Sequence, residues 1–385
     1  MQDKKTFIAK TLHGLEELLA NELKTIGAED VTIQRRMVSF TGNTETLYRA
    51  NFQTRTATRI LMPIYEFKAR NEEELYGLAK KFDWTSVMEL SHRFAVDATV
   101  NSETFTHSHY IALKLKDAVA DHFRDRFGRR PFVDPKKPHI QLHIHINNHD
   151  CTVLLDSSGE SLHKRGYKLY QDIAPINEVL AAGLILLSGW DAKTPFIDPM
   201  CGSGTIAIEA ALIARGIAPG IFRKNFGFEN WLNFEKDTFE KVFNDESYER
   251  NLTPTIIGGD VSKRAIDLTI LNAKNAGMHK FISTEKRSVF DFEPPQGPGT
   301  VITNPPYGER LKKEQITTFY KQLGDGFKQR YQDYKVWMLS GNMEAIKSFG
   351  LHASKTYTLF NGPLECKYLK YDIYSGSKKM KYKEK

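Results

Sequence analysis

The tetrapeptide Asn304-Pro305-Pro306-Tyr307 combines residue types that can bind a flat aromatic amine. The two prolines fix φ and have no backbone N–H, so the turn is rigid and its carbonyls stay free to accept hydrogen bonds. The Asn304 amide can accept from an exocyclic amino group, and the Tyr307 ring can stack on a base. A proline-rich turn after the apolar run 301–303 would give the same pattern, so other motifs must support this interpretation.

A glycine-rich motif lies about a hundred residues upstream, between a short apolar run and an apolar helical stretch. It reads Asp198-Pro199-Met200-Cys201-Gly202-Ser203-Gly204-Thr205. Gly202 and Gly204 let the backbone approach a ligand, and the following helix start supplies unpaired N–H groups. The third glycine of dinucleotide-binding loops is missing, and an acid precedes the turn. Because a carboxylate repels pyrophosphate and attracts a cation, the motif favours S-adenosylmethionine over NAD.

Two further acids accompany strand-like runs downstream. Asp260 ends the run 256–260, where a carboxylate commonly accepts from ribose hydroxyls. Asp291 lies in the strand-like run 288–292, where it could accept the adenine amino group. Either acid alone could instead cap a helix or occupy a solvated turn. Their order along the chain predicts one cofactor site, made of Asp198, Gly202, Ser203, Gly204, Asp260, Asp291 and Asn304.

With these motifs the chain resembles the class I S-adenosylmethionine-dependent methyltransferases that modify exocyclic amino groups. More narrowly, it resembles the THUMP-domain RNA guanine-N2 methyltransferases, and most of all the 23S ribosomal RNA guanine-N2 methyltransferases. Besides the two motifs above, the resemblance is carried by Gly308-Glu309-Arg310 and by Leu162-His163-Lys164-Arg165-Gly166-Tyr167. Some bacteria fuse that activity to a second methyltransferase domain, and we expect a single one here.

The resemblance implies an α/β fold with two functional parts. Residues 175–376 would form a Rossmann-like class I methyltransferase domain with a seven-stranded, mostly parallel sheet. The preceding α+β part would comprise a ferredoxin-like region over residues 1–68 and an overlapping THUMP RNA-binding domain over 44–157. A linker over 158–174 would join the two parts, and 377–385 would be a basic tail.

Hydrophobic periodicity predicts the elements independently. In the N-terminal part we expect helices over residues 14–26, 44–51, 71–82 and 108–127, and strands over 7–10, 31–33, 37–40, 60–67, 93–100, 140–146 and 151–156, the last two as a hairpin. In the C-terminal part we expect a helix opened by Asp172 or Pro175 and ending near Ser188, strands over 194–198 and 336–339, a helix over 263–275, and a hairpin of 357–360 with 364–374. The aromatic stretch 216–253 exceeds a normal connection, which indicates an insertion.

The composition is ordinary for a soluble protein of two or three domains. Of the 385 residues, 26% are charged and 41% are hydrophobic. The longest apolar run, residues 179–187, is too short to span a membrane, and the chain does not open with a signal-like segment. The three cysteines show no metal spacing, which suits a reducing cytoplasm. The sequence gives no indication of an oligomeric state.

The charge distribution suggests where RNA could bind. The formal net charge is +7, and cations mixed with aromatic residues are dense over residues 124–137. The RNA-binding candidates are Arg124, Arg126, Arg129, Arg130, Lys136 and Lys137, joined by Lys164 and Arg165 of the expected linker. A solvated helix end with its loop would explain the same run of charges.

Two other groups could carry chemistry. His143 and His145 would share one face of a strand, but no Cys or carboxylate accompanies them at matching spacing, so we expect no metal. Cys201 could be a nucleophile, as in some RNA methyltransferases. It lies inside the cofactor turn, however, and an amino group needs no covalent activation, so we interpret it as a small turn residue.

The chemistry expected is in-line methyl transfer to guanine N2. Asn304 Oδ1 and the Pro305 carbonyl would accept the two amine N–H bonds, Pro306 would hold the turn, and Tyr307 would stack on the base. The motif serves adenine N6 and cytosine N4 equally well, so guanine rests on the resemblance. The alternatives are the same reaction on tRNA, a DNA adenine-N6 or protein glutamine methyltransferase, and a non-enzymatic ribosome-assembly factor.

Overall fold

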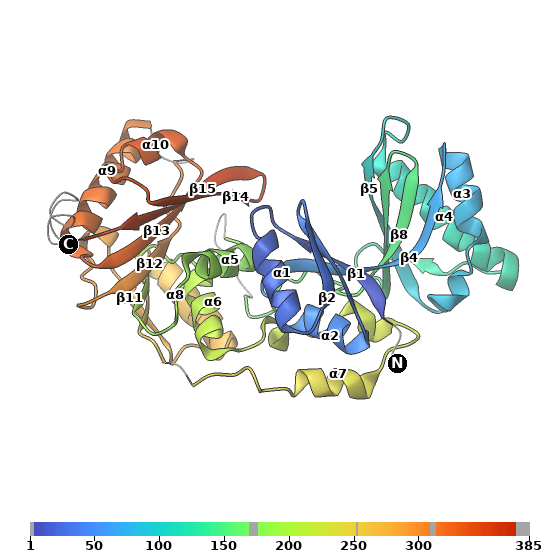
Figure 1. The fold of residues 1–385 in the computed structure, drawn as a ribbon, viewed down its shortest axis with the longest axis horizontal. Coiled ribbons are helices and arrows are strands. Elements are labelled where there is room, and N and C mark those ends of the chain that lie inside the picture. The colour runs from blue at the N-terminus through green and yellow to red at the C-terminus, as the bar shows by residue number, and fades with distance from the viewer. Residues whose placement is uncertain (1–3, 169–175, 252, 309–312, 375–385) are drawn as a thin grey trace. The chain divides into compact units, whose positions relative to one another are not determined.

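The chain folds into two compact units in the computed structural model, which describes residues 4–168, 176–251, 253–308 and 313–374 (Figure 1). The first unit comprises Met1–Thr11, Leu19–Leu162 and Arg223–Asp245, and the second comprises Leu12–Leu18, His163–Phe222 and Glu246–Lys385. Some residues discussed above lie outside the described parts of the chain, namely Asp172, Pro175, Glu309, Arg310 and the tail 377–385.

The second unit is built on a seven-stranded sheet in the order β11-β10-β9-β12-β13-β15-β14. Its strands are β9 (Phe196–Asp198), β10 (Ile256–Asp260), β11 (Ile282–Lys286), β12 (Gly299–Thr303), β13 (Tyr334–Ser340), β14 (Lys355–Asn361) and β15 (Leu364–Asp372). The first five pair in parallel, whereas β15 pairs antiparallel with both β13 and β14. The structure therefore confirms the predicted mostly parallel sheet and its closing hairpin.

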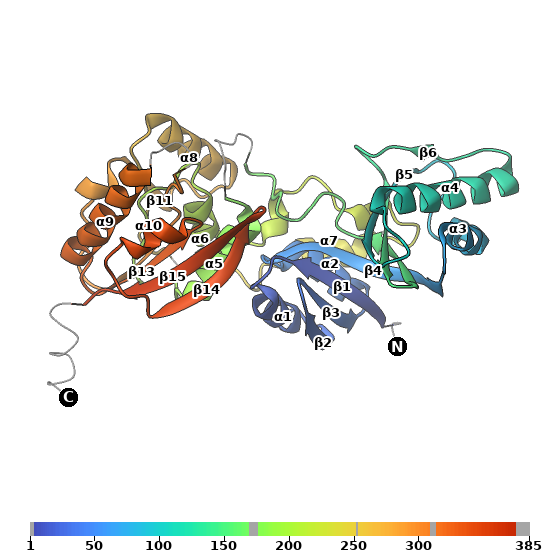
Figure 2. The same ribbon diagram turned by 90° about the horizontal axis from the view of Figure 1, so that it is seen from above.

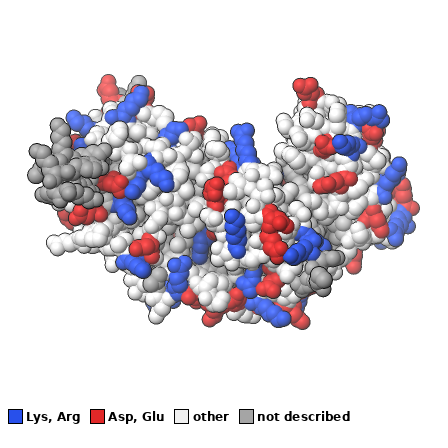
Figure 3. All heavy atoms as spheres, in the orientation of Figure 1, with Lys and Arg blue, Asp and Glu red and all other residues white. Residues whose placement is uncertain are grey.

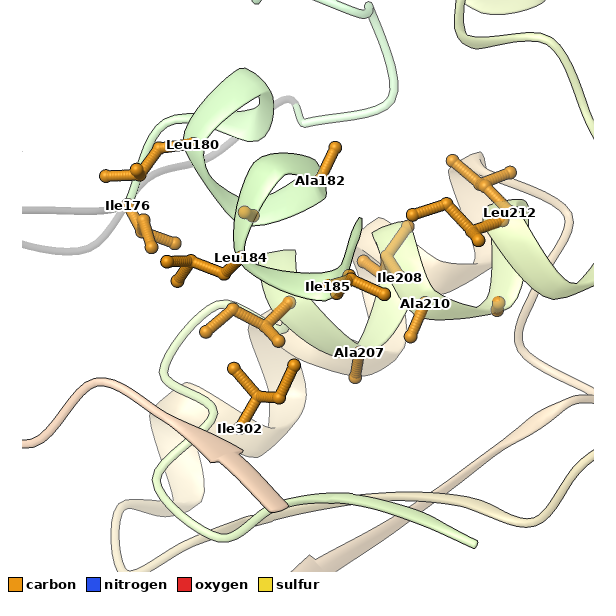
Figure 4. Packing of buried hydrophobic residues seen from close by; sticks show 14 of the residues in the cluster. Ile176, Leu180, Ala182, Leu184, Ile185, Ala207, Ile208, Ala210, Leu212 and Ile302 are labelled. Carbon is orange, nitrogen blue, oxygen red and sulfur yellow. The ribbon is translucent and has the colours of Figure 1, made fainter. Parts of the chain in front are cut away.

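Helices cover both faces of this sheet (Figure 2). On one face lie α5 (Glu178–Ser188), α6 (Thr205–Arg215) and α8 (Lys263–Asn275), and on the other lie α9 (Lys313–Arg330) and α10 (Met343–Lys347). Because successive strand residues point to opposite faces, Ile302 belongs to the core cluster that contains Leu184 and Ile208 (Figure 4), while its neighbour Val301 belongs to the cluster that contains residues of α9. Burying each such side chain stabilises the fold by about 1.5–3 kcal/mol.

The strand order creates a switch point beside β9. This strand pairs with β10 on one side and with β12 on the other, because the chain adds β10 and β11 on one side of β9 and then crosses back to add β12 and β13 on the other side. Open α/β sheets bind ligands outside the carboxyl ends of their strands at such a point. Asp198, Asp260 and Thr303 end these three strands, so residues far apart in sequence meet at one edge of the sheet.

The first unit contains an eight-stranded sheet in the order β2-β3-β1-β4-β8-β7-β5-β6. Its strands are β1 (Lys5–Thr11), β2 (Glu29–Gln34), β3 (Met37–Gly42), β4 (Ala57–Lys68), β5 (Arg93–Asn101), β6 (Phe132–Val133), β7 (Ile140–Asn147) and β8 (Asp150–Asp156). Its helices are α1 (Glu16–Thr25), α2 (Thr44–Gln53), α3 (Glu72–Lys81) and α4 (Ser108–Phe127). The long strand β4 pairs with β1 near its start and with β8 further on, so it joins two α+β halves. The expected β7–β8 hairpin is confirmed.

The segment Arg223–Asp245 explains much of the unusually long connection after α6. It leaves the second unit and belongs to the first, where it carries a 3-10 turn (Gly227–Asn230) and α7 (Lys236–Phe243). Aromatic rings hold it there, because Tyr48 of α2 lies 4.3 Å from Phe228 and 5.7 Å from Phe239 between ring centroids. The predicted insertion is thus a packed part of the N-terminal unit.

Candidate active site

The turn between β9 and α6 requires glycine at its last position. Gly204 has φ +81°, and a Cβ atom there would lie 2.6 Å from Cγ2 of Thr269. At the start of the turn, the Cys201 N–H donates to the Gly259 carbonyl at 2.8 Å. The turn is therefore clamped between β10 and α8, with the first residues of α6 directed at the carboxyl edge of the sheet.

Asp260 and its neighbours fix the middle of the turn. One Asp260 oxygen accepts from the Gly202 N–H at 3.0 Å, and the other accepts from the Ser262 N–H at 2.8 Å. The Asn272 amide of α8 donates to the Ser203 carbonyl at 3.1 Å. Gly202 also has a positive φ, +55°, but a Cβ atom there would meet open space. The backbone of this turn is thus held in place, while Gly202 faces outward.

Asp198 is a buried acid that lacks a cationic partner among the described residues. It is 1% exposed, and its only hydrogen bond there comes from the Met200 N–H at 3.4 Å. Burial, with a smaller contribution from Asp260, raises its pKa to about 8. The hydroxyls of Thr205 and Thr303 are also buried without a partner within the described chain. An uncompensated carboxylate beside unpaired hydroxyls fits a cationic, polar ligand such as S-adenosylmethionine.

Asp291 lies in a 3-10 turn after β11 and not in a strand as we expected. The run 288–292 is not a strand, because β11 is Ile282–Lys286 and residues Val289–Asp291 form a 3-10 turn. The Ser288 hydroxyl accepts from the Phe290 N–H at 3.2 Å, a local bond that competes with strand pairing. Asp291 is exposed and lies beyond the carboxyl end of β11, on the same edge of the sheet as Asp198.

The Asn304–Tyr307 turn directly follows β12, as the sequence predicts. The Asn342 amide donates to the Tyr307 carbonyl at 2.8 Å, and the Tyr320 hydroxyl donates to the Pro306 carbonyl at 3.4 Å. Pro305 is buried, and its carbonyl accepts from none of the residues that the structure describes. The turn is therefore supported by Asn342, which follows β13, and by Tyr320 of α9, while the Pro305 carbonyl remains available.

The Tyr307 hydroxyl holds the side chain of Asn304. This hydroxyl donates to Asn304 Oδ1 at 2.5 Å and lies 3.8 Å from the Cys366 sulfur, and the ring packs against the core below α5. Burial raises the pKa of the Tyr307 hydroxyl, so it remains a donor. We expected the ring to stack on a base; part of the ring is buried against the core, and its stacking on a base stays a prediction.

Sequence reasoning missed Asn342, which holds the turn from the next strand. Its side-chain oxygen caps α10 by accepting from the Ala345 N–H at 2.9 Å, and its NH2 group reaches Tyr307. Its position two residues after the apolar run that forms β13 was the available signal, because carboxyl ends of parallel strands converge.

Cys201 is a packed residue of the cofactor turn. Its side chain is 7% exposed, and burial raises the thiol pKa, which disfavours the nucleophilic thiolate. Across the described residues, His, Cys, Asp and Glu side chains form no group of three or more that could hold a metal ion.

The expected RNA-binding cations differ in how much charge they leave free. Asp121 contacts both Arg124 (3.2 Å) and Arg130 (2.6 Å), and Asp83 contacts Arg126 (3.0 Å). The remaining cations of this run form no ion pair with a described residue; they are Arg129, Lys136 and Lys137. On the face drawn in Figure 3, basic and acidic side chains are interspersed rather than gathered into one positive patch.

The two linker cations, Lys164 and Arg165, differ in their exposure to solvent. Arg165 is 1% exposed and lies 3.7 Å from Glu209, whose carboxylate also accepts from the Tyr167 hydroxyl at 2.9 Å. A guanidinium buried in this way cannot contact RNA, so our expectation for Arg165 is wrong. Lys164 is exposed and stays a candidate.

Fold and site together define a class I methyltransferase: a mostly parallel seven-stranded sheet with an acid–glycine turn and an Asn-Pro-Pro-Tyr turn at its carboxyl edge. Family profiles agree along the chain, matching an RlmL ferredoxin-like domain at residues 6–61, a THUMP domain at 69–156 and an RMKL-like methyltransferase domain at 165–370. The chain belongs to this RMKL-like methyltransferase family, whose methyl donor is S-adenosylmethionine.

Similar proteins support this assignment. The chain is 38% identical over 380 residues to the ribosomal RNA large subunit methyltransferase K/L of Syntrophotalea carbinolica, covering 95% of this chain and 53% of that protein. It is 37% identical to a Synechocystis protein assigned as an RNA methyltransferase, covering 96% and 97%. The solved protein SMU.472, assigned as a methyltransferase and complexed with S-adenosylhomocysteine, superposes with a TM-score of 0.86 at 30% identity, covering 98% and 100%.

The chain spans about half the length of the K/L relatives that it matches. Within the described residues, the structure contains no helix long and apolar enough to cross a membrane.

Proposed function

We propose that this chain methylates the exocyclic N2 amino group of a guanosine in 23S ribosomal RNA. One observation carries the proposal: the Asn304–Tyr307 turn ends β12 beside β9, whose last residue is the buried acid Asp198. An amine-binding turn and a site suited to a cationic methyl donor thus share one edge of the sheet. The naming of the K/L relatives supports ribosomal RNA as the substrate, and tRNA is the alternative RNA.

The cofactor would be held mainly through charge and backbone contacts. Asp198 would pair with a cationic group, Asp260 would accept from ribose hydroxyls, and Asp291 would accept the adenine amino group. Gly202, Ser203 and Gly204 would let the backbone approach closely. When bound, S-adenosylmethionine supplies an electrophilic methyl group on a positively charged sulfur.

The target amine would be positioned by the turn. Asn304 Oδ1 has a second lone pair besides the one that receives the Tyr307 hydroxyl, and the Pro305 carbonyl has both. Accepting both amine N–H bonds orients the nitrogen lone pair toward the methyl carbon, which is a gain of orientation and directed hydrogen bonding. The proton released from the methylated nitrogen would pass to water.

The test is a nuclease digest of 23S rRNA and of tRNA from a strain lacking the gene, with the nucleosides identified by mass spectrometry. We expect one N2-methylguanosine to be missing from 23S rRNA and to return with the wild-type gene, but not with an Asn304→Ala gene. If N2-methylguanosine is instead missing from tRNA, the substrate is tRNA. Loss of N6-methyladenosine instead, or of no modified nucleoside, would overturn the proposal.

A further inference from the structure

The first unit contains a cavity of about 780 Å³ that belongs to no part of the proposed active site. Three segments far apart in sequence build it: β1, the middle of β4, and the loop after the 3-10 turn of the inserted segment, with further residues from the α3 end and β8. Its lining includes Lys5, Tyr65, Glu66, Phe82 and Trp231. This volume lies within the range of small-molecule sites.

Flat aromatic surfaces give the cavity its chemistry. The Tyr65 and Phe82 rings are stacked, with centroids 4.8 Å apart and an angle of 30° between their planes. Trp231 lies in the wall contributed by the inserted segment, and its indole N–H donates to no acceptor in the described parts of the chain. Tyr65 also lies 4.8 Å from Phe67, with an angle of 31° between the ring planes; neither Tyr65 nor Phe82 is fully buried, so part of each side chain remains accessible.

The cavity lining carries one positive and one negative side chain, Lys5 and Glu66. Lys5 and Glu66 are both exposed, and neither forms an ion pair with a described residue. One cation and one anion cannot hold a run of phosphates, which would need several cations. They can serve one nucleotide, because Lys5 can bind a single phosphate while Glu66 accepts from a base amino group.

We propose that this cavity binds an unpaired nucleobase of the RNA substrate, stacked on the exposed part of the Tyr65 and Phe82 pair. The inference rests on the proposed function, because it takes the substrate to be RNA. Single-stranded segments are the parts of an RNA that proteins recognise by stacking on aromatic rings. The cavity would therefore favour RNA that offers an unpaired base, as in a loop or a bulge.

The test uses the full chain and fluorescein-labelled hexaribonucleotides of adenosine or uridine, with binding measured by anisotropy. Tyr65→Phe keeps the ring and should bind as the wild type does. Tyr65→Leu removes the ring and should weaken binding about 10-fold or more. Lys5→Ala should weaken it about threefold. Lys4→Ala, which removes a lysine outside the lining that is paired with Glu29 at 2.6 Å, should have little effect.

Affinity for S-adenosylmethionine, measured by calorimetry, should be the same in all four variants. A Tyr65→Leu variant that binds both hexanucleotides like the wild type would overturn the inference, as would equal losses in Tyr65→Phe and Tyr65→Leu. Methyl transfer to 23S rRNA is assayed separately. If methyl transfer occurs but Tyr65→Leu changes neither hexanucleotide binding nor the KM for RNA, only this inference fails. If hexanucleotide binding depends on the Tyr65 ring but no RNA is methylated, only the proposed function fails.

Discussion

A carboxylate is costly to bury without a cation, and Asp198 is buried with none among the described residues. Proteins keep such groups where a ligand compensates them, and pKa values that burial has shifted cluster at functional sites. The neighbouring Asp260 differs, because backbone N–H groups already satisfy it. At the residue scale, the two acids therefore differ: Asp260 holds the turn between β9 and α6 and keeps further lone pairs for the proposed ribose contact, whereas Asp198 lacks a partner that would stabilise its charge among the described residues.

Replacing Asp198 by Asn should stabilise the unliganded protein in a pH-dependent way. The pKa is raised from 3.8 to about 8, so the folded state keeps a proton that the unfolded chain has released, and stability falls as pH rises from about 4 to about 8. Asp198→Asn removes this loss. We expect the Tm of the variant to match that of the wild type at about pH 4 and to exceed it at about pH 8.5. Each 1 kcal/mol gained in the free energy of unfolding should raise Tm by about 2–4 °C.

Differential scanning fluorimetry checks this prediction, and calorimetry should show that the variant no longer binds S-adenosylmethionine measurably. For the wild type, the affinity for S-adenosylmethionine should rise as pH increases toward about 8, because Asp198 loses its proton over this range. A variant that is less stable at high pH, or that keeps the cofactor affinity, would contradict the role given to this carboxylate.

The Tyr307 hydroxyl should matter through Asn304. Tyr307→Phe keeps the ring but removes the hydrogen bond that fixes the Asn304 amide, which is worth about 1 kcal/mol. We expect kcat to fall about fivefold to tenfold, with KM for RNA and cofactor affinity unchanged. Steady-state methyl transfer measures both. A raised KM with unchanged kcat would instead indicate a role in substrate binding.

At the scale of elements, the cofactor turn depends on a glycine that faces α8. Gly202 and Gly204 both have positive φ, but only Gly204 would bring a Cβ atom against Thr269. Replacing either by Ala costs about 1–2 kcal/mol of backbone strain, and Gly204→Ala adds a steric clash. Gly204→Ala should therefore lower Tm and cofactor affinity more than Gly202→Ala.

Combining Gly204→Ala with Thr269→Ser removes the methyl group that clashes and should recover part of the loss. Equal Tm values for the two single glycine variants would show that the approach of α8 does not constrain the turn.

The elements that sequence predicts well are those with local signals. The runs that became β12 and β13, the β7–β8 and β14–β15 hairpins and helix α8 all carry their own periodicity or turn residues. Residues 288–292 misled us because their apolar content resembles a strand, while the Ser288 hydroxyl makes a local bond that favours a 3-10 turn.

The site shows the same limit. Its motifs were visible in the sequence, but the support of Asn342 and the burial of Arg165 against Glu209 depend on tertiary contacts that no local pattern records. The place of the segment Arg223–Asp245 in the fold was equally hidden, because its aromatic residues have no regular spacing and meet partners such as Tyr48 and Phe52 of α2 only through tertiary contacts.

At the scale of the whole molecule, RNA affinity should depend on the cations that the protein itself leaves unpaired. Replacing Arg129, Lys136 and Lys137 together by Ala should weaken RNA binding and make the slope of log affinity against log salt shallower by about 2. Affinity for S-adenosylmethionine should not change. Filter binding over a range of salt concentrations measures the slope.

A charge-neutral control removes Asp121 together with Arg130; Arg124, the other partner of Asp121, keeps Asp125 at 3.5 Å. This double Ala variant should keep nearly the wild-type slope. If the double variant loses as much RNA affinity as the triple variant, the ion-paired cations also contact RNA. The division between paired and unpaired cations is then wrong.

The most direct test of the account compares Asn304→Ala with the wild type in one experiment. Purified protein is mixed with 23S rRNA from a strain lacking the gene and with radiolabelled S-adenosylmethionine, and both methyl transfer and cofactor affinity are measured. We predict formation of N2-methylguanosine by the wild type, a loss of at least about 100-fold in turnover for the variant, and little change in cofactor affinity. Turnover by Asn304→Ala at the wild-type rate would contradict the claim that this turn holds the reacting amine.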